Sequence, residues 1–416
     1  MGKLSSIADY VTDKISSNDV SLYEYVTTDC ILQNKKGREK ATNLPPQPCS
    51  LTHYQRGDVL IANIRPYLKK VWFADIEGGA SSDVLVFRAK EGHSPSFLYA
   101  ILLQDSFFDY VMQGVKGSKM PRGDKEQILR YEMPTLSCSE ESIGTLFLNL
   151  DLKIKLNEQI NQNLEAMAKQ LYDYWFVQFD FPNKDGRPYK SSDGKMVWNK
   201  KIKREIPEGW KEVTLNDFID KNKGGDWGYD TPKDGTIKVG CVRGADIIKL
   251  NDVPTRHITS KHSDRLLEDG DIVIEISGGS PVQATGRVAL ITNGVIERNG
   301  GALVCSNFCQ SFNMKKREFS EYFYYLWQNL YDNDNMFNFE GKTSGIKNFQ
   351  TDVFLANYWF EVPEPLIETF HTIVAQYHLM IDQNIIENNN LIKQRDKLLP
   401  LLMNGQVSVN SDLSHG

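Results

Sequence analysis

The sequence predicts a mixed α/β (α+β) protein in which two similar globular modules are separated by two long helices that pair as an antiparallel coiled coil. The first observation is an internal repeat, because Gly57-Asp58-Val59 recurs as Gly270-Asp271-Ile272. The second is a long helical stretch behind each copy, at residues 139–176 and 365–403. Two copies of one module, each ending in a similar helix, predict a pseudo-twofold molecule.

These features divide the chain into six segments. We predict a first module, a long helix, a basic linker, a second module, a second long helix and a C-terminal tail. Their boundaries are 1–137, 138–180, 181–206, 207–363, 364–404 and 405–416, in that order.

Each module is expected to contain a β-sheet, because short runs of alternating apolar residues are bounded by turn residues. Each Gly-Asp pair is interpreted as a turn that enters a strand and carries no chemistry. The aromatic stretch 95–112 is predicted as one helix packed in the core. The expected strands are 58–64, 68–74 and 83–88 in the first module, and 271–276, 288–291 and 302–305 in the second.

Apolar side chains recur every seven residues in both long helices, which is the spacing of a helix–helix seam. The predicted seam consists of Ile143, Leu150, Asn157, Leu164 and Leu171 on the first helix and Phe370, Tyr377, Asn384, Leu391 and Leu398 on the second. On the first helix, a second column is expected at Leu146, Ile160, Met167 and Tyr174, interrupted by Lys153.

An asparagine takes the middle place of the main column in both helices. A buried asparagine costs stability unless it finds a hydrogen-bonding partner, and it thereby selects one register. We therefore predict that Asn157 and Asn384 lie near the centre of a two-helix seam. The alternative is two separate helices, each packed on its own module with its asparagine exposed.

Composition places the chain among ordinary globular proteins. It has 416 residues with 40% hydrophobic content, enough for two cores and the connecting helices. We find no apolar run of the roughly 18 residues that cross a bilayer and no export signal, so the cytoplasm is the expected location. The six cysteines lack paired spacing and are expected to be free thiols, with no metal site.

The net charge of −6 argues against a protein that holds nucleic acid by its overall charge. Cations nevertheless gather in two stretches, residues 114–130 and 186–204. Either stretch can be a simple solvated face. If DNA is the ligand, a partner protein must supply part of the grip on the phosphates.

Two polar loops, 114–123 and 341–348, are the best candidates for ligand contact. They combine glycine, which permits close approach of the backbone, with hydroxyls and cations that bind phosphates or base edges. Duplex DNA with a divided site is the commonest target that suits a duplicated protein.

The sequence contains no recognisable catalytic motif. The order of residues around Asn43 does not match an amino-methyltransferase, and no glycine-rich turn indicates a dinucleotide or AdoMet site. Asp271 and Glu275 would suit a metal-dependent nuclease, but Ser277 stands where such a site needs lysine. A subunit that recognises and assembles fits better than an enzyme.

Several local motifs resemble the specificity subunits of type I restriction-modification systems, the HsdS family, and the resemblance covers nearly the whole chain. The first module lacks the family's Pro-x-Gly-Trp lead-in, which the second module has. The matching stretches are 57–61, 63–67, 161–166, 171–176, 206–210 and 398–405.

The resemblance implies a non-catalytic subunit with two target-recognition domains, each reading one half of a bipartite asymmetric DNA site. The paired helices would set the gap between the halves. Two methyltransferase subunits and endonuclease subunits would be partners, with AdoMet, ATP and Mg²⁺ bound by them and no cofactor bound by this chain. The alternatives are a coiled-coil adaptor that binds only proteins and a self-sufficient DNA nuclease.

Side chains on the module loops are expected to contact DNA, since arginine, lysine and glutamine can bond base edges. An aromatic run near the end of the first helix is a candidate for docking a partner subunit, or for packing on its own module. The DNA candidates are Arg65, Tyr67, Lys116, Ser118, Lys119 and Arg122 in the first module, and Arg243, Ser280, Gln283, Lys342, Ser344 and Lys347 in the second. The docking candidates are Tyr172, Tyr174, Trp175 and Phe176.

Overall fold

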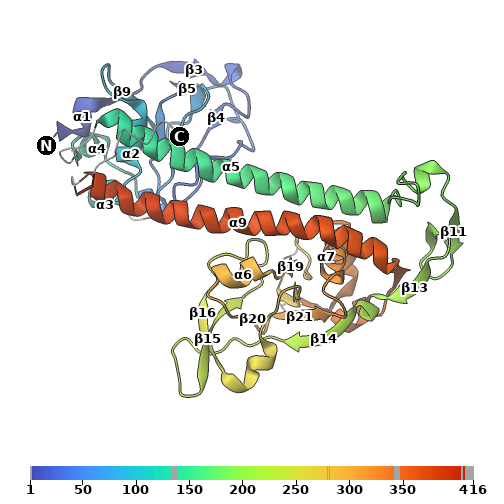
Figure 1. The fold of residues 1–416 in the computed structure, drawn as a ribbon. Coiled ribbons are helices and arrows are strands. Elements are labelled where there is room, and N and C mark those ends of the chain that lie inside the picture. Colours follow the sequence, from blue (N-terminus) through green and yellow to red (C-terminus); the bar gives the residue numbers. More distant parts are fainter. Residues whose placement is uncertain are drawn as a thin grey trace. The chain divides into compact units, whose positions relative to one another are not determined.

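A computed structural model describes residues 2–117, 119–133, 139–278, 280, 282–341, 347–403 and 406–407. The chain divides into two compact units (Figure 1). Unit 1 contains residues 1–156 and 388–416, and unit 2 contains residues 157–387. Both boundaries fall inside long helices, so each unit holds one globular module and one portion of each helix. Among the described residues, no helix is both long and apolar enough to cross a membrane.

Unit 1 is built on two four-stranded sheets. The first is antiparallel and has the order β2-β9-β6-β7, and the second has the order β3-β5-β8-β4. The first sheet comprises β2 (Ala8–Tyr10), β9 (Val84–Ala89), β6 (Val59–Ala62) and β7 (Val71–Phe73). The second comprises β3 (Lys14–Ser16), β5 (Ser50–Tyr54), β8 (Gly78–Ala80) and β4 (Tyr25–Val26).

Short helices cover the first sheet of unit 1 and share its apolar core. The single helix predicted over 95–112 is wrong, because the chain leaves helical geometry at Gln104 before α3 starts. The carboxylate of Asp105, in the first turn of α3, pairs with Lys35 and Lys69 at 2.9 and 2.8 Å. The helices are α1 (Leu4–Ile7), α2 (Pro95–Leu102), α3 (Asp105–Gln113) and α4 (Lys125–Leu129), and β1 (Gly2–Lys3) pairs with β10 (Glu132–Met133).

Unit 2 repeats the first sheet with the order β14-β21-β17-β19, again antiparallel throughout. The counterpart of β9 is therefore β21, whereas the predicted strand 302–305 is β20 of a different sheet. The repeated sheet comprises β14 (Ile219–Gly224), β21 (Cys309–Met314), β17 (Ile272–Glu275) and β19 (Val288–Leu290). A three-stranded sheet comprises β16 (Thr255–Thr259), β15 (Thr236–Val242) and β20 (Leu303–Cys305).

Smaller sheets and helices complete unit 2. The three-stranded group is β18 (Ser277–Gly278), β23 (Lys347–Phe349) and β22 (Glu340–Gly341), and the pairs are β13 (Lys211–Thr214) with β24 (Tyr358–Glu361) and β11 (Met196–Asn199) with β12 (Arg204–Pro207). The helices are α6 (Asn293–Arg298), α7 (Phe319–Asp332) and α8 (Thr351–Leu355).

The two Gly-Asp pairs adopt the same turn at the start of β6 and β17. Gly57 and Gly270 have φ of 89° and 91°, a conformation that glycine adopts without steric cost. The carboxylates of Asp58 and Asp271 accept the N–H three residues earlier, at 2.8 and 2.9 Å. Each is also bound by a cation, Arg88 or, for Asp271, Lys223. This agrees with the interpretation of both pairs as structural turns.

Two long helices are confirmed: α5 (Glu140–Tyr172), which ends in a π-helical turn (Asp173–Val177), and α9 (Glu364–Met403). Within unit 1, Arg395 bonds Asp151 at 2.9 Å and the Asn388 amide donates to the Ile154 carbonyl at 3.3 Å. Along α5 the residue numbers of the contacts rise while those of their partners on α9 fall, so the helix portions in unit 1 are antiparallel.

The portions in unit 2 are antiparallel as well. The Asn157 amide donates to Glu387 at 2.7 Å, and the Asn384 amide donates to the Asn161 oxygen at 2.8 Å. Asn157 is fully buried. The alternative of separate helices predicted that it would be exposed. The two predicted asparagines therefore do not bond each other in these hydrogen bonds. Asn157 bonds Glu387, one turn after Asn384, and Asn384 bonds Asn161, one turn after Asn157.

The second seam column predicted on α5 is wrong by one residue. Met167 and Tyr174 are exposed, whereas the positions one residue later are buried. At two of these positions, Phe147 and Trp175 pack in the cores of units 1 and 2. On α9, the predicted column from Phe370 to Leu398 is mostly half-buried. The more buried column on α9 is Ile367, Val374, Ile381, Asn388, Arg395 and Leu402.

Candidate nucleic-acid interface

Two loops of unit 1 come together as one surface. The backbones of Lys116 and Arg122 exchange hydrogen bonds at 3.0 and 3.1 Å, which closes the loop between them. Arg122 also forms a β-bridge with Ile64, and the Arg65 N–H donates to the Pro121 carbonyl at 2.9 Å. The loop after β6 and the loop after α3 are therefore held side by side.

This surface gathers the first-module residues that the sequence predicted. Tyr67 is half-exposed in the turn that follows Arg65, and Lys119 is exposed in the adjoining loop. Ser118, the remaining candidate, lies outside the described residues.

The cations of this surface differ in whether they form ion pairs with carboxylates. Lys116 pairs with Asp124 at 2.5 Å, and this hydrogen bond holds the pKa of the Asp124 carboxyl below its ordinary value. Arg122 pairs with Asp83 at 3.0 Å. Arg65 and Lys119 make no ion pair with any described residue. Exposed ion pairs are worth roughly 0–1 kcal/mol, so a phosphate can replace the carboxylates at little cost.

Buried amides fix both ends of the loop that carries Lys119. A Cβ on Gly114 would lie 2.2 Å from the Gln127 side-chain oxygen, and one on Gly123 would lie 2.9 Å from the Asn63 side-chain oxygen. A larger residue at either loop end would therefore displace one of these amides. Asn63 and Gln127 were not among the predicted site residues. Neither side chain is charged, although Asn63 begins the matching stretch 63–67.

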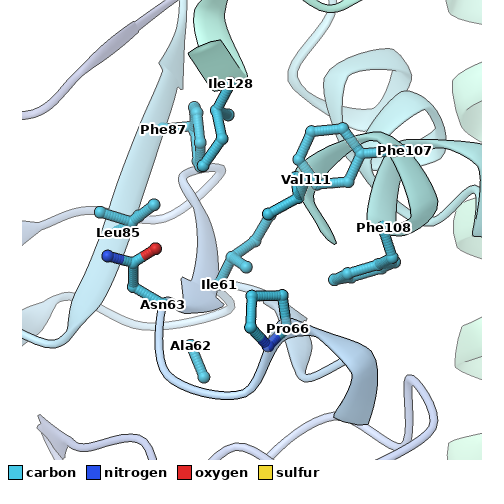
Figure 2. Close-up of a pocket in the computed structure, with 10 residues that line it drawn as sticks. All are labelled: Ile61, Ala62, Asn63, Pro66, Leu85, Phe87, Phe107, Phe108, Val111 and Ile128. Carbon is cyan, nitrogen blue, oxygen red and sulfur yellow. The ribbon is translucent and has the colours of Figure 1, made fainter. Parts of the chain in front are cut away.

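Asn63 ties three segments together at the base of this surface. Its N–H donates to the Asp83 carbonyl at 2.8 Å, and its carbonyl accepts from the Gly123 N–H at 3.3 Å. Its side-chain oxygen is buried and finds no hydrogen-bond donor among the described residues. Figure 2 shows Asn63 at the edge of a cavity of about 10 Å³, which is otherwise lined by apolar side chains such as Val111 and Ile128.

In unit 2, β18 and β23 bring predicted residues together. Gly278 pairs with Lys347 across these strands, and the backbones of Ser280 and Gln283 bond each other at 3.0 and 3.2 Å. The Lys347 ammonium pairs with Glu340 at 2.7 Å and is only partly exposed, so its charge already has a partner within the loop. Lys342 and Ser344 lie outside the described residues.

Arg243 approaches the same region from β15. Its guanidinium bonds Asp246 at 2.8 and 2.9 Å. The adjacent Gly244 and the β18 residue Gly278 both lie against the Glu275 carboxylate, 2.7 Å from a Cβ built on either glycine. The end of β15 therefore meets the loop that follows β17.

The acidic residues considered for a nuclease are neutralised in the fold. Glu275 is buried and pairs with Arg287 at 2.6 Å, and Asp271 is buried and pairs with Lys223 at 2.9 Å. Across the described residues, no group of three or more His, Cys, Asp or Glu side chains is arranged to hold a metal ion. The five cysteines described are free thiols.

The predicted docking residues on α5 are mostly core residues. Tyr172, Trp175 and Phe176 are buried in unit 2 against Tyr322 and Phe370. Of the two roles considered for this aromatic run, these three side chains have the second, because they pack the helix on its own module and are not available for docking. Tyr174 is 38% exposed and remains available to a partner.

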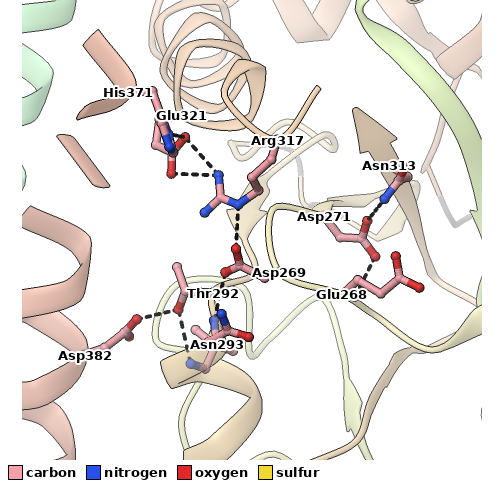
Figure 3. Close-up of polar contacts among 11 residues, drawn as sticks. Glu268, Asp269, Asp271, Thr292, Asn293, Asn313, Arg317, Glu321, His371 and Asp382 are labelled. Atoms are coloured by element: carbon pink, nitrogen blue, oxygen red, sulfur yellow. Dashed lines mark hydrogen bonds and ion pairs between the residues drawn. The ribbon is translucent and has the colours of Figure 1, made fainter. Parts of the chain in front are cut away.

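A chain of ion pairs joins α9 to the turn before β17 (Figure 3). Asp269 of that turn bonds Arg317 at 2.6 Å, Arg317 bonds Glu321 at 2.9 Å, and Glu321 bonds His371 at 2.7 Å. Burial alone would raise the pKa of the Glu321 carboxyl, but the His371 hydrogen bond and the Arg317 charge hold it below its ordinary value. The Glu321 hydrogen bond raises the pKa of His371.

Part of the chain matches a known protein family, and the chain is similar to curated proteins. Residues 207–394 match the family described as type I restriction modification DNA specificity domain. Over 95% of its length the chain is 23% identical to the type I restriction enzyme MjaIX specificity subunit of Methanocaldococcus jannaschii, of which it covers 86%. The second module and most of the second long helix therefore carry the domain that this family describes.

Two further type I specificity subunits are similar to this chain. The HindI specificity subunit of Haemophilus influenzae is 26% identical over 188 residues, which are 42% of this chain and 40% of that one. The crystal structure of a type I restriction-modification S subunit from M. genitalium matches 96% of this chain and 95% of its own with a TM-score of 0.54 and 13% identity. This structural match supports the mixed helix-and-strand fold.

Proposed function

We propose that this chain is the DNA sequence-specificity subunit of a type I restriction-modification complex and performs no catalysis itself. The observation that carries this conclusion is the repeated sheet. The orders β2-β9-β6-β7 and β14-β21-β17-β19 place one loop cluster in each unit. A protein with two such clusters suits a target with two parts.

Each module would read one half of a bipartite, asymmetric DNA site, the first within residues 1–137 and the second within residues 207–363. Among the predicted first-module cations, Arg65 and Lys119 are those without a carboxylate partner in the described part of the chain, and we assign them to base edges or phosphates. In the second module we assign this role to Gln283, whose amide can bond adenine.

The helix pairing seen in each unit would form one antiparallel coiled coil that sets the spacing between the half-sites. Two methyltransferase subunits and the endonuclease subunits would be the partners. AdoMet, ATP and Mg²⁺ would be bound by those partners, and the basic stretches of this chain would share the phosphate contacts with them.

Mapping of methylated bases in cells with and without this chain tests the proposal. The partner methyltransferase should modify adenines within one bipartite motif only when the chain is present. Methylation of the same motif in cells that lack the chain would contradict the proposal. Turnover of DNA by the purified chain would contradict its non-catalytic role.

A further inference from the structure

The segment predicted as a basic linker is a folded part of unit 2. Its strands β11 and β12 form a hairpin (Figure 1) whose Ile206 is buried in the core of the unit together with Phe179 and Phe181. Asp180 accepts hydrogen bonds from the N–H and the hydroxyl of Ser191, at 2.7 and 2.6 Å. A segment held by these contacts presents its surface side chains in fixed positions.

Two cations of the hairpin have structural roles. The Arg204 guanidinium lies 4.8 Å from the ring centre of Phe179, and its burial lowers its pKa. Lys201 pairs with Glu212 at 2.8 Å, and hydrogen bonds from Lys201 and Asn199 lower the pKa of Glu212 to about 2. These contacts fix the turn between β11 and β12.

Other cations of the segment point into solvent. Residues 183–204 contain eight lysines and arginines against two aspartates, in a chain whose net charge is −6. Within the described parts of the chain, five of these cations are exposed and pair with no carboxylate: Lys184, Arg187, Lys190, Lys200 and Lys203.

An exposed tryptophan lies among these cations. Trp198 of β11 is 63% exposed, two residues before Lys200 and opposite the exposed Glu205 of β12. An exposed indole beside unpaired cations offers apolar contact and charge together, as nucleic-acid-binding surfaces do. Lysine is depleted in protein–protein interfaces, so charge and composition both favour a nucleic acid over an acidic protein.

We infer that this surface, here named the hairpin patch and comprising Lys184, Arg187, Lys190, Trp198, Lys200 and Lys203, binds the DNA backbone without reading its sequence. Its cations would contact phosphates, and the indole would cover a neighbouring sugar. The inference rests on the proposed function, since the ligand is the same DNA. It also explains how an acidic chain contributes to the grip on DNA itself.

Salt dependence of binding to a duplex that lacks the recognised motif tests the inference on the full-length chain. Each lost phosphate contact lowers the slope of log K against log salt concentration by about 0.9. The triple variant K190A/K200A/K203A should therefore lower the slope by about 2 to 3. The matched control K3A/K36A/K40A removes three exposed lysines of unit 1 and should leave the slope unchanged.

Trp198→Ala should weaken binding several-fold with an unchanged slope, and Trp198→Phe should restore part of the affinity. Equal slopes for the two triple variants would overturn the inference. A second result would also overturn it: the triple variant K190A/K200A/K203A no longer binds the methyltransferase subunit, while its slope of log K against log salt concentration is unchanged. The hairpin patch would then bind protein and not DNA.

The methylation motif separates this inference from the proposed function. Variants of the hairpin patch should methylate the same motif as the unmodified chain, at lower occupancy. If the methylated motif depends on the chain but the two triple variants have equal slopes, the DNA-binding role of the hairpin patch is refuted and the proposed function is not. The absence of any chain-dependent motif refutes the proposed function.

Discussion

The pair of Asp151 and Arg395 should be the strongest single link between the helices in unit 1. The Arg395 guanidinium is 5% exposed and the Asp151 carboxylate 18% exposed, with 2.9 Å between them. Asp151 also accepts the Tyr99 hydroxyl at 2.5 Å, which ties the module to α5. Replacing Asp151 with alanine leaves a buried cation and a buried hydroxyl without their acceptor.

Breaking a buried ion pair from one side costs roughly 3–5 kcal/mol. The lower part of that range applies here, because Asp396 keeps a contact of 3.2 Å with the guanidinium. We expect Asp151→Ala to lower the free energy of unfolding of unit 1 by about 3 kcal/mol. Urea denaturation of the full chain, followed by hydrogen exchange, measures the loss and assigns it to a unit.

The matched control is an exposed pair between the same helix and the first module. Lys155 and Asp75 lie 2.7 Å apart and are each about half exposed. Asp75→Ala should cost less than about 1 kcal/mol. The double variant D151L/R395M should recover more than half of the loss, because it removes the stranded charge. A cost for Asp151→Ala no greater than that of the control would refute this reasoning.

Three further outcomes are expected. Gly123→Ala should weaken methylation of the cognate site at least tenfold, since its Cβ collides with Asn63, while leaving the second half of the motif unchanged; an unaltered rate would count against the loop geometry. The Glu321–His371 pair should stabilise unit 2 most in weak acid, because the Glu321 contribution is lost as pH falls through its lowered pKa and the His371 contribution is lost as pH rises through its raised pKa. His371→Gln should flatten the fall above pH 6.5 in a denaturation series, and an unchanged profile would contradict this. Asn161→Leu should destabilise unit 2 by about 1–3 kcal/mol in the same assay, because it strands an amide on α9, and an unaffected midpoint would argue against the polar seam.

Local features were predictable from the sequence. The Gly-Asp turns follow from a positive φ and an aspartate that bonds its own loop, both of which are set within four residues. The long helices and the main seam column on α5 follow from heptad spacing. The loop candidates of the first module could be selected by their glycines, hydroxyls and cations, whereas the backbone contacts between the loop after β6 and the loop after α3 could not be predicted.

Features that depend on tertiary contacts were not predictable. A heptad pattern does not distinguish a second column at Leu146 from one at Phe147, because both are apolar. The buried column of α9 could not be predicted from apolar spacing, because Asn388 and Arg395 are polar. Their hydrogen-bond partners lie on α5. The aromatic run ending at Phe176 became core only through residues more than a hundred positions away, such as Tyr322.

The central claim is that each module reads one half of a divided DNA site, and methylation mapping with one variant in each module tests it most directly. Cells would carry the partner methyltransferase with Lys119→Ala in the first module or Gln283→Ala in the second. We predict that each variant relaxes base preference in one half of the motif and leaves the other half unchanged. Simultaneous change of both halves by either variant, or one motif shared by cells with and without the chain, would contradict the account.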